Sequence, residues 1–168
     1  MPAIISIVGK KGSGKADVLQ NLIQHLKAKG FRIGVLKNLK RDDIEIDEAG
    51  TDTYEYRMKG AETVILAGRK RFAMFSNLEE SIPFEKLLNH FKDFDFVFLE
   101  GYVENNFPKI EVHKKELGEL LLSERETNVI AVCSDGLSRP DAPSFGFNQI
   151  DQLTCIIEEQ ILCPTKPQ

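Results

Sequence analysis

The hydrophobic positions of this chain fall into two kinds of stretch, short continuous runs and longer segments at helical spacing. Residues 3–8 form an apolar run that stops at Gly9 and predicts a buried strand. In residues 15–29 the hydrophobic positions recur every three or four residues up to Gly30, which predicts a helix. Residues 31–37 predict a second strand, and this order predicts a βαβ unit whose two strands form a parallel pair.

The rest of the chain continues this alternation. Residues 38–53 are polar and acidic with little periodicity, and they predict a long loop of the kind that often carries function. Two apolar runs flank a basic turn at residues 69–71 and predict a hairpin. Together the pattern predicts a three-layer α/β domain with a mostly parallel sheet and an added antiparallel hairpin. The remaining predicted elements are helices near 53–59, 83–92 and 150–161 and strands at 95–101, 108–114 and 128–136.

Composition places the chain among ordinary globular proteins. Its 168 residues are 42% hydrophobic and 29% charged, which allows a single domain, predicted over residues 1–163 with a flexible tail at 164–168. The net charge of −4 favours no nucleic-acid partner, and no apolar run reaches the roughly 18 residues that a membrane span needs. The three cysteines are widely separated, which indicates reduced thiols and a cytoplasmic protein.

The turn between the first strand and the first helix carries a phosphate-binding pattern. Its sequence GKKGSGK, at residues 9–15, matches the G-x-x-x-x-G-K of nucleotide-binding loops. The backbone N–H groups of such a loop converge on an anion, the helix dipole adds positive charge, and Lys15 reaches the outer phosphates. The plainer alternative is a glycine-rich turn before a lysine-bearing helix. The candidate nucleotide-binding residues here are Gly9, Gly12, Ser13, Gly14, Lys15, Ala16 and Asp17.

The next residue departs from the pattern, because Ala16 replaces the Ser or Thr whose hydroxyl normally holds Mg²⁺. We therefore expect phosphate binding to survive and the positioning of Mg²⁺ to weaken. Asp17 is adjacent, but successive helical residues point about 100° apart, which favours a first-turn carboxylate over a substitute ligand. Glu100 ends a buried strand at the edge where α/β sheets bind ligands, so it is the best candidate to organise the metal or its waters. The alternative is a solvated strand end.

Other charged residues leave alternatives open. Asp95 begins the strand that Glu100 ends and is predicted to be a strand boundary far from the phosphates. Lys37 ends the second strand beside the loop and is a candidate to offset phosphate charge, whereas residues 69–71 are interpreted as surface charge. The acidic loop offers carboxylates that could hold Mg²⁺ or only be solvated. These are Asp42, Asp43, Asp47 and Asp52.

Several stretches, taken in order, give the chain a family likeness. They are GKKGSGK, GVLKN, IDEAGTDTYEYRMKGAE, FLEGYVENNFPKIEV and IAVCSD, and the likeness runs from Ile4 to about Ile161. On these stretches the chain resembles the MobB family, the molybdopterin-guanine dinucleotide biosynthesis protein B group of GTP-binding proteins. The first stretch is shared by a very large superfamily, whereas the second to fourth, in this order and spacing, are much more specific.

The resemblance implies a P-loop NTPase fold and a role in molybdenum cofactor assembly. It implies that the chain binds GTP with Mg²⁺, is at most a weak GTPase, forms a homodimer and assists the molybdenum cofactor guanylyltransferase that attaches GMP to molybdopterin. Glu100 and Asp47 are then the candidate catalytic and metal-binding residues. Gly50, Asp52 and Arg57 match the acidic loop and the helix after it.

Three positions depart from the family pattern. Ala16 is the first, and KNLKRDD stands where members usually carry histidines. Val103 stands where members often have a lysine after the Glu-Gly pair and an aromatic residue. The chain has no Asn-Lys-x-Asp motif for guanine. Asp135 is the nearest candidate to accept hydrogen bonds from guanine N1 and N2, and its alternative is a strand-end turn residue.

Two other functions remain as alternatives to the accessory protein. A P-loop small-molecule kinase would need an acceptor pocket, metal organisation and an arginine-bearing lid, for which residues 69–71 are the candidate. A scaffold that no longer binds nucleotide is the third function. The retained Gly14 and Lys15 argue against that scaffold.

Overall fold

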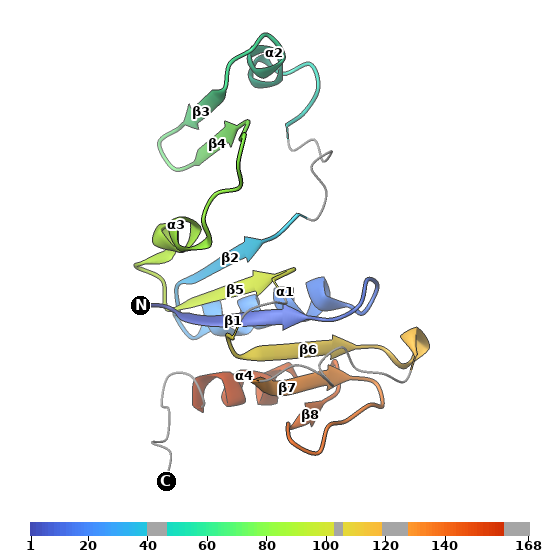
Figure 1. The fold of residues 1–168 in the computed structure, drawn as a ribbon. Coiled ribbons are helices and arrows are strands. Elements are labelled where there is room, and N and C mark those ends of the chain that lie inside the picture. The colour runs from blue at the N-terminus through green and yellow to red at the C-terminus, as the bar shows by residue number, and fades with distance from the viewer. Residues whose placement is uncertain (40–46, 103–105, 119–127, 160–168) are drawn as a thin grey trace. The chain divides into compact units, whose positions relative to one another are not determined.

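The computed structural model divides the chain into two compact units (Figure 1). The first unit comprises Met1–Asn38 together with His90–Gln168, and the second is the intervening segment Leu39–Asn89. The single domain over residues 1–163 stays a prediction, and the tail at 164–168 lies outside the described residues. The described residues are 1–39, 47–102, 106–118 and 128–159.

A six-stranded parallel sheet forms the centre of the first unit (Figure 1). Its strands are β1 (Ala3–Val8), β2 (Ile33–Lys37), β5 (Phe96–Glu100), β6 (Lys109–His113), β7 (Val129–Ser134) and β8 (Ser144–Phe145). In space they follow the order β2-β5-β1-β6-β7-β8, and every pairing is parallel. The predicted pairing of the first two strands is wrong, because β5 lies between β1 and β2 and pairs with both. The short β8 was not predicted.

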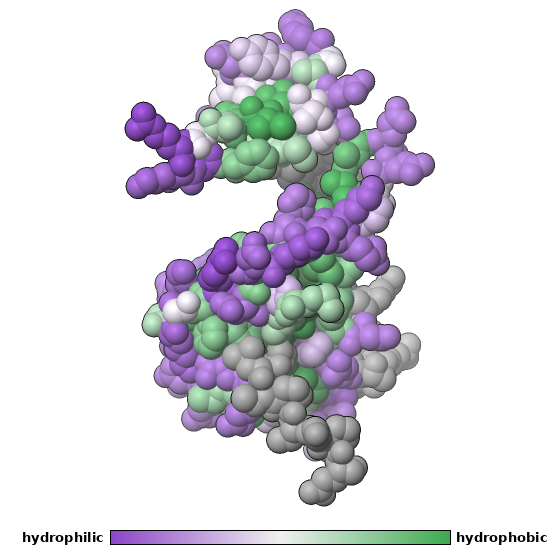
Figure 2. Space-filling view, turned by 90° about the vertical axis from the view of Figure 1, so that its left-hand side faces the viewer, coloured by the Kyte–Doolittle hydropathy of each residue, from purple (hydrophilic) through white to green (hydrophobic). Residues whose placement is uncertain are grey.

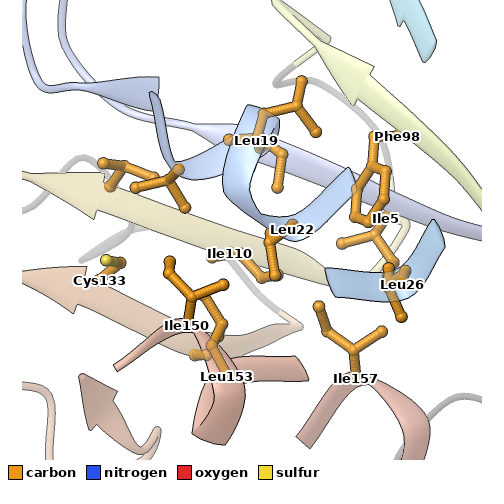
Figure 3. Close-up of a cluster of buried hydrophobic side chains, with 14 of the residues drawn as sticks. Ile5, Leu19, Leu22, Leu26, Phe98, Ile110, Cys133, Ile150, Leu153 and Ile157 are labelled. Carbon is orange, nitrogen blue, oxygen red and sulfur yellow. The ribbon is translucent and has the colours of Figure 1, made fainter. Parts of the chain in front are cut away.

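Two helices, α1 (Lys15–Ala28) and α4 (Ile150–Ile157), pack against one face of this sheet and close the core (Figure 3). Leu22 of α1 and Leu153 of α4 are fully buried there with Phe98 of β5. Each such side chain contributes roughly 1.5–3 kcal/mol relative to an exposed one. Both helices lie on the same face of the sheet, and the predicted α/β fold with a mostly parallel sheet and an added antiparallel hairpin is confirmed. None of the helices among those residues is long and apolar enough to cross a membrane.

Cys133 of β7 lies in this core as a free thiol. Burial raises the pKa of the Cys133 thiol to about 11, so the side chain stays neutral and acts as a small hydrophobic group. Cys155 is free and exposed, and Cys163 lies outside the described residues.

The second unit contains α2 (Asp52–Met58), β3 (Thr63–Ala67), β4 (Phe72–Ser76) and α3 (Phe84–Leu88), followed by a 3₁₀ turn at Asn89–Phe91. The predicted hairpin is confirmed, since β3 and β4 pair antiparallel. The helix predicted near 53–59 is also confirmed. The helix predicted at 83–92 is shorter, because it changes to the 3₁₀ turn after Leu88.

Candidate phosphate-binding site

The segment between β1 and α1 forms a tight loop, and its geometry requires two of the glycines. Gly9 has φ +152°, and a Cβ atom there would overlap the Val112 carbonyl oxygen of β6. Gly14 precedes α1 with φ +87°, in the left-handed region that residues with a side chain avoid. The turn therefore brings the loop directly onto the N-terminus of α1, where the helix dipole favours an anion.

Lys15, the first residue of α1, is held against this loop by two hydrogen bonds. Its Nζ donates to the Gly9 carbonyl oxygen at 2.9 Å and to the Lys10 carbonyl oxygen at 2.8 Å. The ammonium group therefore stays beside the helix N-terminus, where its charge and the helix dipole act on the same anion. This geometry suits the role predicted for Lys15, which is to contact the outer phosphates of a nucleotide.

A cavity of about 370 Å³ opens beside the loop, within the range of roughly 300–1,000 Å³ that is usual for ligand sites. Three lysines and two carboxylates line it, so positive side chains outnumber negative ones. Lys11 and Lys114 were not among the predicted site residues. Lys114 directly follows β6 and so lies at the carboxyl edge of the sheet, the signal that could have found it. The lining residues are Lys11, Gly12, Gly14, Lys15, Ala16, Asp17, Glu100 and Lys114.

Glu100 lines this cavity from the end of β5. Its Oε1 lies 3.2 Å from the Lys37 Nζ, and the two residues are direct neighbours on adjacent strands. The Glu100 side chain is 16% exposed and the Lys37 side chain 55%, so the carboxylate is the more buried partner of this ion pair. Asp95 lies at the other end of β5, where it accepts a hydrogen bond from the Arg32 N–H at 2.6 Å, as expected of a strand boundary.

The described residues around the loop fit a phosphate group better than a magnesium ion, which requires oxygen ligands in tight octahedral geometry. Ala16 offers no side-chain oxygen, and the Glu100 carboxylate is already paired with Lys37. In the described part of the chain, no group of three or more His, Cys, Asp or Glu side chains could hold a metal ion. The metal-binding role of Glu100 stays a prediction.

Asp47 belongs to the second unit and organises the turn before α2. Its Oδ1 accepts hydrogen bonds from a backbone N–H at 3.0 Å and from the hydroxyls of Thr51 at 3.3 Å and Thr53 at 3.1 Å. These bonds give Asp47 a local structural role, and its catalytic and metal-binding roles stay predictions. Of the other acidic loop residues, Asp52 begins α2, and Asp42 and Asp43 lie outside the described residues.

Asp135 directly follows β7, at the same edge of the sheet as the phosphate loop. Its Oδ1 accepts a hydrogen bond from the Lys115 backbone N–H at 2.7 Å. The preceding Ser134 hydroxyl accepts from the N–H groups of Gly136 at 3.2 Å and Leu137 at 2.9 Å. This geometry is that of a turn, the alternative we gave for Asp135, and its role in reading guanine stays a prediction.

Comparisons with known proteins identify relatives of this chain. The family model described as "Molybdopterin guanine dinucleotide synthesis protein B", MobB, matches residues 4–135. The molybdopterin-guanine dinucleotide biosynthesis adapter protein of Haemophilus influenzae is 29% identical over 157 residues, which cover 92% of this chain and 87% of that protein. The adapter protein of the same name from Escherichia coli is 29% identical over 166 residues, which cover 95% of this chain and 93% of that protein.

A solved structure agrees with the fold. The crystal structure of Bacillus subtilis MobB matches with a TM-score of 0.75 at 20% identity, covering 96% of this chain and 98% of that one. At this identity the likeness shows the fold alone, a parallel sheet with helices of the P-loop NTPase kind. The family model spans well over half of the sequence and includes the phosphate loop and the strand that Glu100 ends. The chain therefore belongs to the MobB family, molybdopterin guanine dinucleotide synthesis protein B.

Proposed function

We propose that this chain is a GTP-binding adapter protein of molybdenum cofactor biosynthesis, which assists a guanylyltransferase in attaching GMP to molybdopterin. The observation that carries the proposal is the family match over residues 4–135, which includes the G-x-x-x-x-G-K pattern of the phosphate loop. Two relatives that align over nearly the whole chain are named molybdopterin-guanine dinucleotide biosynthesis adapter proteins, which supports the same role. The partners in this proposal are the guanylyltransferase and molybdopterin.

The proposed GTP site is the cavity beside the phosphate loop. Lys15 would contact the outer phosphates, and the first turn of α1 would add backbone N–H donors. Toward the Mg²⁺ that accompanies the nucleotide, Glu100 and Asp47 are the predicted residues that orient its waters. Because Ala16 lacks the usual hydroxyl, hydrolysis is slow at most in this proposal, and the chain acts mainly by binding.

A homodimer formed through the second unit is part of the proposal. Ile65, Phe72 and Met74 share one face of the β3–β4 hairpin and are 56%, 70% and 50% exposed. Figure 2 shows hydrophobic residues gathered on the surface of this unit. Apolar patches and open strand edges of this kind suit pairing with a second copy. The strand β6 has no free edge for such pairing, because it lies inside the sheet between β1 and β7.

The kinase alternative gains no support from the described residues. Residues 69–71, its lid candidate, form the tight turn of the hairpin, where the Gly68 N–H donates to the Arg71 carbonyl oxygen at 2.8 Å. A cytoplasmic location belongs to the proposal, and the free thiols of Cys133 and Cys155 support it.

Lys15→Ala tests the proposed site. Calorimetric titration should show GTP binding to the wild-type chain and a roughly ten- to hundredfold weaker affinity for the variant, since a charge-assisted contact contributes about 1.5–3 kcal/mol. Lys27→Ala, at an exposed position near the other end of α1, is the matched control and should bind GTP as the wild type does. In the same experiment GDP and ATP report on selectivity.

The adapter role has its own measurement. The wild-type chain should increase the rate at which a molybdenum cofactor guanylyltransferase attaches GMP to molybdopterin, and Lys15→Ala should reduce that increase. An unchanged rate on addition of the folded wild-type chain would contradict the adapter role.

A further inference from the structure

The alanine at position 16 leaves the charge of bound phosphates to be balanced by other groups. In loops with a Ser or Thr at this position, the hydroxyl holds Mg²⁺, which neutralises the outer phosphate oxygens. Here that ligand is missing, and Glu100 adds a negative charge to the same cavity. A nucleotide that binds this loop therefore needs positive charge from the chain itself.

Lys114 lies where such charge would act. It directly follows β6, and its side chain lines the loop cavity. Its Cε lies 3.5 Å from the position that a Cβ on Gly14 would take, so the lysine stem runs along the residue that precedes α1. Lys10 is also close to the loop, but its Nζ donates to the Leu117 carbonyl oxygen at 3.1 Å and so binds the turn that follows β6. Lys114 thus brings a second ammonium group toward the helix N-terminus beside Lys15.

Lys37 contributes to the charge of the cavity by pairing with Glu100. Its Nζ lies 3.2 Å from the Glu100 Oε1, so a cation of this chain offsets the carboxylate that faces the cavity. Without Lys37, the Glu100 charge would repel phosphates and attract a metal ion. The ion pair therefore lowers the need for magnesium at this edge of the site.

We propose that Lys114 is a further phosphate-binding residue, and that Lys114 and Lys37 supply the counter-charge that Mg²⁺ supplies in loops with a hydroxyl at this position. GTP then binds with nearly the same affinity in the presence and absence of Mg²⁺. Lysine suits the task because its ammonium is a compact charge with three donors on a flexible stem. The inference rests on the proposed function, which assigns GTP to this loop.

Calorimetric titration with GTP, once in EDTA and once at saturating Mg²⁺, tests the inference. The two dissociation constants of the wild-type chain should agree within about threefold, a small fraction of the binding free energy. Lys114→Met should weaken binding in EDTA roughly tenfold or more, and Lys114→Arg, which keeps the charge, should restore most of the affinity. Lys115→Met is the matched control, because Lys115 is the next residue and does not line the cavity.

Three further variants test how GTP affinity depends on Mg²⁺. Lys37→Met should weaken binding in EDTA and make Mg²⁺ restore it, and adding Glu100→Gln should remove this dependence because no unpaired carboxylate remains. Ala16→Thr should improve affinity only when Mg²⁺ is present. Circular dichroism identifies the folded variants, and the Lys37 and Ala16 variants test the inference even where Lys114→Met does not fold.

The outcomes separate this inference from the proposed function. Wild-type binding that is tenfold or more weaker in EDTA would overturn the inference and leave the GTP site in place. A folded Lys114→Met variant that binds GTP in EDTA as tightly as the wild type would do the same. No GTP binding in either buffer would overturn the proposed GTP site and the inference together.

Discussion

The two units of this chain contain similar apolar strands, but they bury them to very different extents. In the first unit Phe98 and Ile110 are fully inaccessible within a six-stranded sheet. In the second unit Phe72 is largely exposed, and no described residue of α2, β3, β4 or α3 is buried. The first unit therefore completes its own core, whereas the second keeps apolar side chains at its surface.

The difference in burial suits the first unit to a rigid phosphate site and the second unit to contact with another surface. A phosphate site needs a backbone that does not move, and Gly9, packed against the Val112 carbonyl, is held by the core strands of the first unit. A two-stranded hairpin is marginally stable by itself, and it gains most when another surface covers its apolar face. The second unit contains such a hairpin, and a surface hollow of about 950 Å³ lies between α2 and the hairpin.

Truncating the same residue type in both units should give the largest contrast. Phe98→Ala removes a fully buried ring that stacks on Phe96 with 6.4 Å between ring centroids, and it should lower the free energy of unfolding by about 3–5 kcal/mol. Phe72→Ala removes an exposed ring and should change that free energy by no more than about 0.5 kcal/mol. Urea unfolding followed by circular dichroism measures both.

Protein concentration separates folding from self-association in this comparison. At concentrations where light scattering gives a monomer, the two variants should differ as stated, and equal losses would contradict the contrast in burial. At higher concentration Phe72→Ala should weaken the proposed dimer roughly tenfold or more, since a buried Phe side chain contributes about 1.5–3 kcal/mol. A wild-type chain that stays monomeric at all concentrations would remove the dimer from the proposal.

One glycine in each unit allows the same comparison for the packing of the backbone. Gly9→Ala places a Cβ onto the Val112 carbonyl oxygen at a positive φ, and should lower the free energy of unfolding by about 2–4 kcal/mol. Gly60, in the second unit, also has a positive φ of +103°, but a Cβ there meets nothing within 4 Å. Gly60→Ala should therefore cost only about 1–2 kcal/mol. Only Gly9→Ala should also weaken GTP binding in calorimetry, and equal effects of the two variants would argue against a tightly packed loop.

The strands with continuous apolar runs were predictable because the signal is local. Residues 3–8, 95–101 and 128–136 became β1, β5 and β7. Their order in the sheet was not predictable in the same way, because the insertion of β5 between β1 and β2 depends on pairings between segments far apart in the sequence. The loop motif and the strand-end position likewise located Lys15 and Glu100, which the structure brings to one cavity.

The position of β6 inside the sheet was not predictable from its sequence either. The alternating pattern of β6 predicts one solvent-facing side, yet Lys109, Glu111 and His113 are all buried. Polar side chains are buried when hydrogen bonds satisfy them, and the His113 Nε2 lies 2.8 Å from the Gly118 carbonyl oxygen. Such contacts are formed by the fold and leave no pattern in the sequence, so β6 could not be recognised as an inner strand.

Thr51→Ala tests the second unit by itself, through the cap of a single short helix. The Thr51 hydroxyl accepts a hydrogen bond from the Tyr54 N–H at 3.3 Å and so caps α2. Its loss should cost about 0.5–2 kcal/mol. Because α2 buries no residue, the cost should appear as local opening, seen as faster amide hydrogen exchange in α2 and unchanged exchange in β5. Equal acceleration in both elements would mean that the two units open together.

The same measurement sharpens the role of Asp47. Its Oδ1 accepts hydrogen bonds from the hydroxyls of Thr51 and Thr53, so Asp47→Ala should speed exchange in α2 much as Thr51→Ala does. If Asp47 acts only on this turn, the GTP affinity of Asp47→Ala should equal that of Thr51→Ala at saturating Mg²⁺. A larger loss of affinity in Asp47→Ala would show a second role for the carboxylate, because both variants disturb the same cap and only one removes a charge.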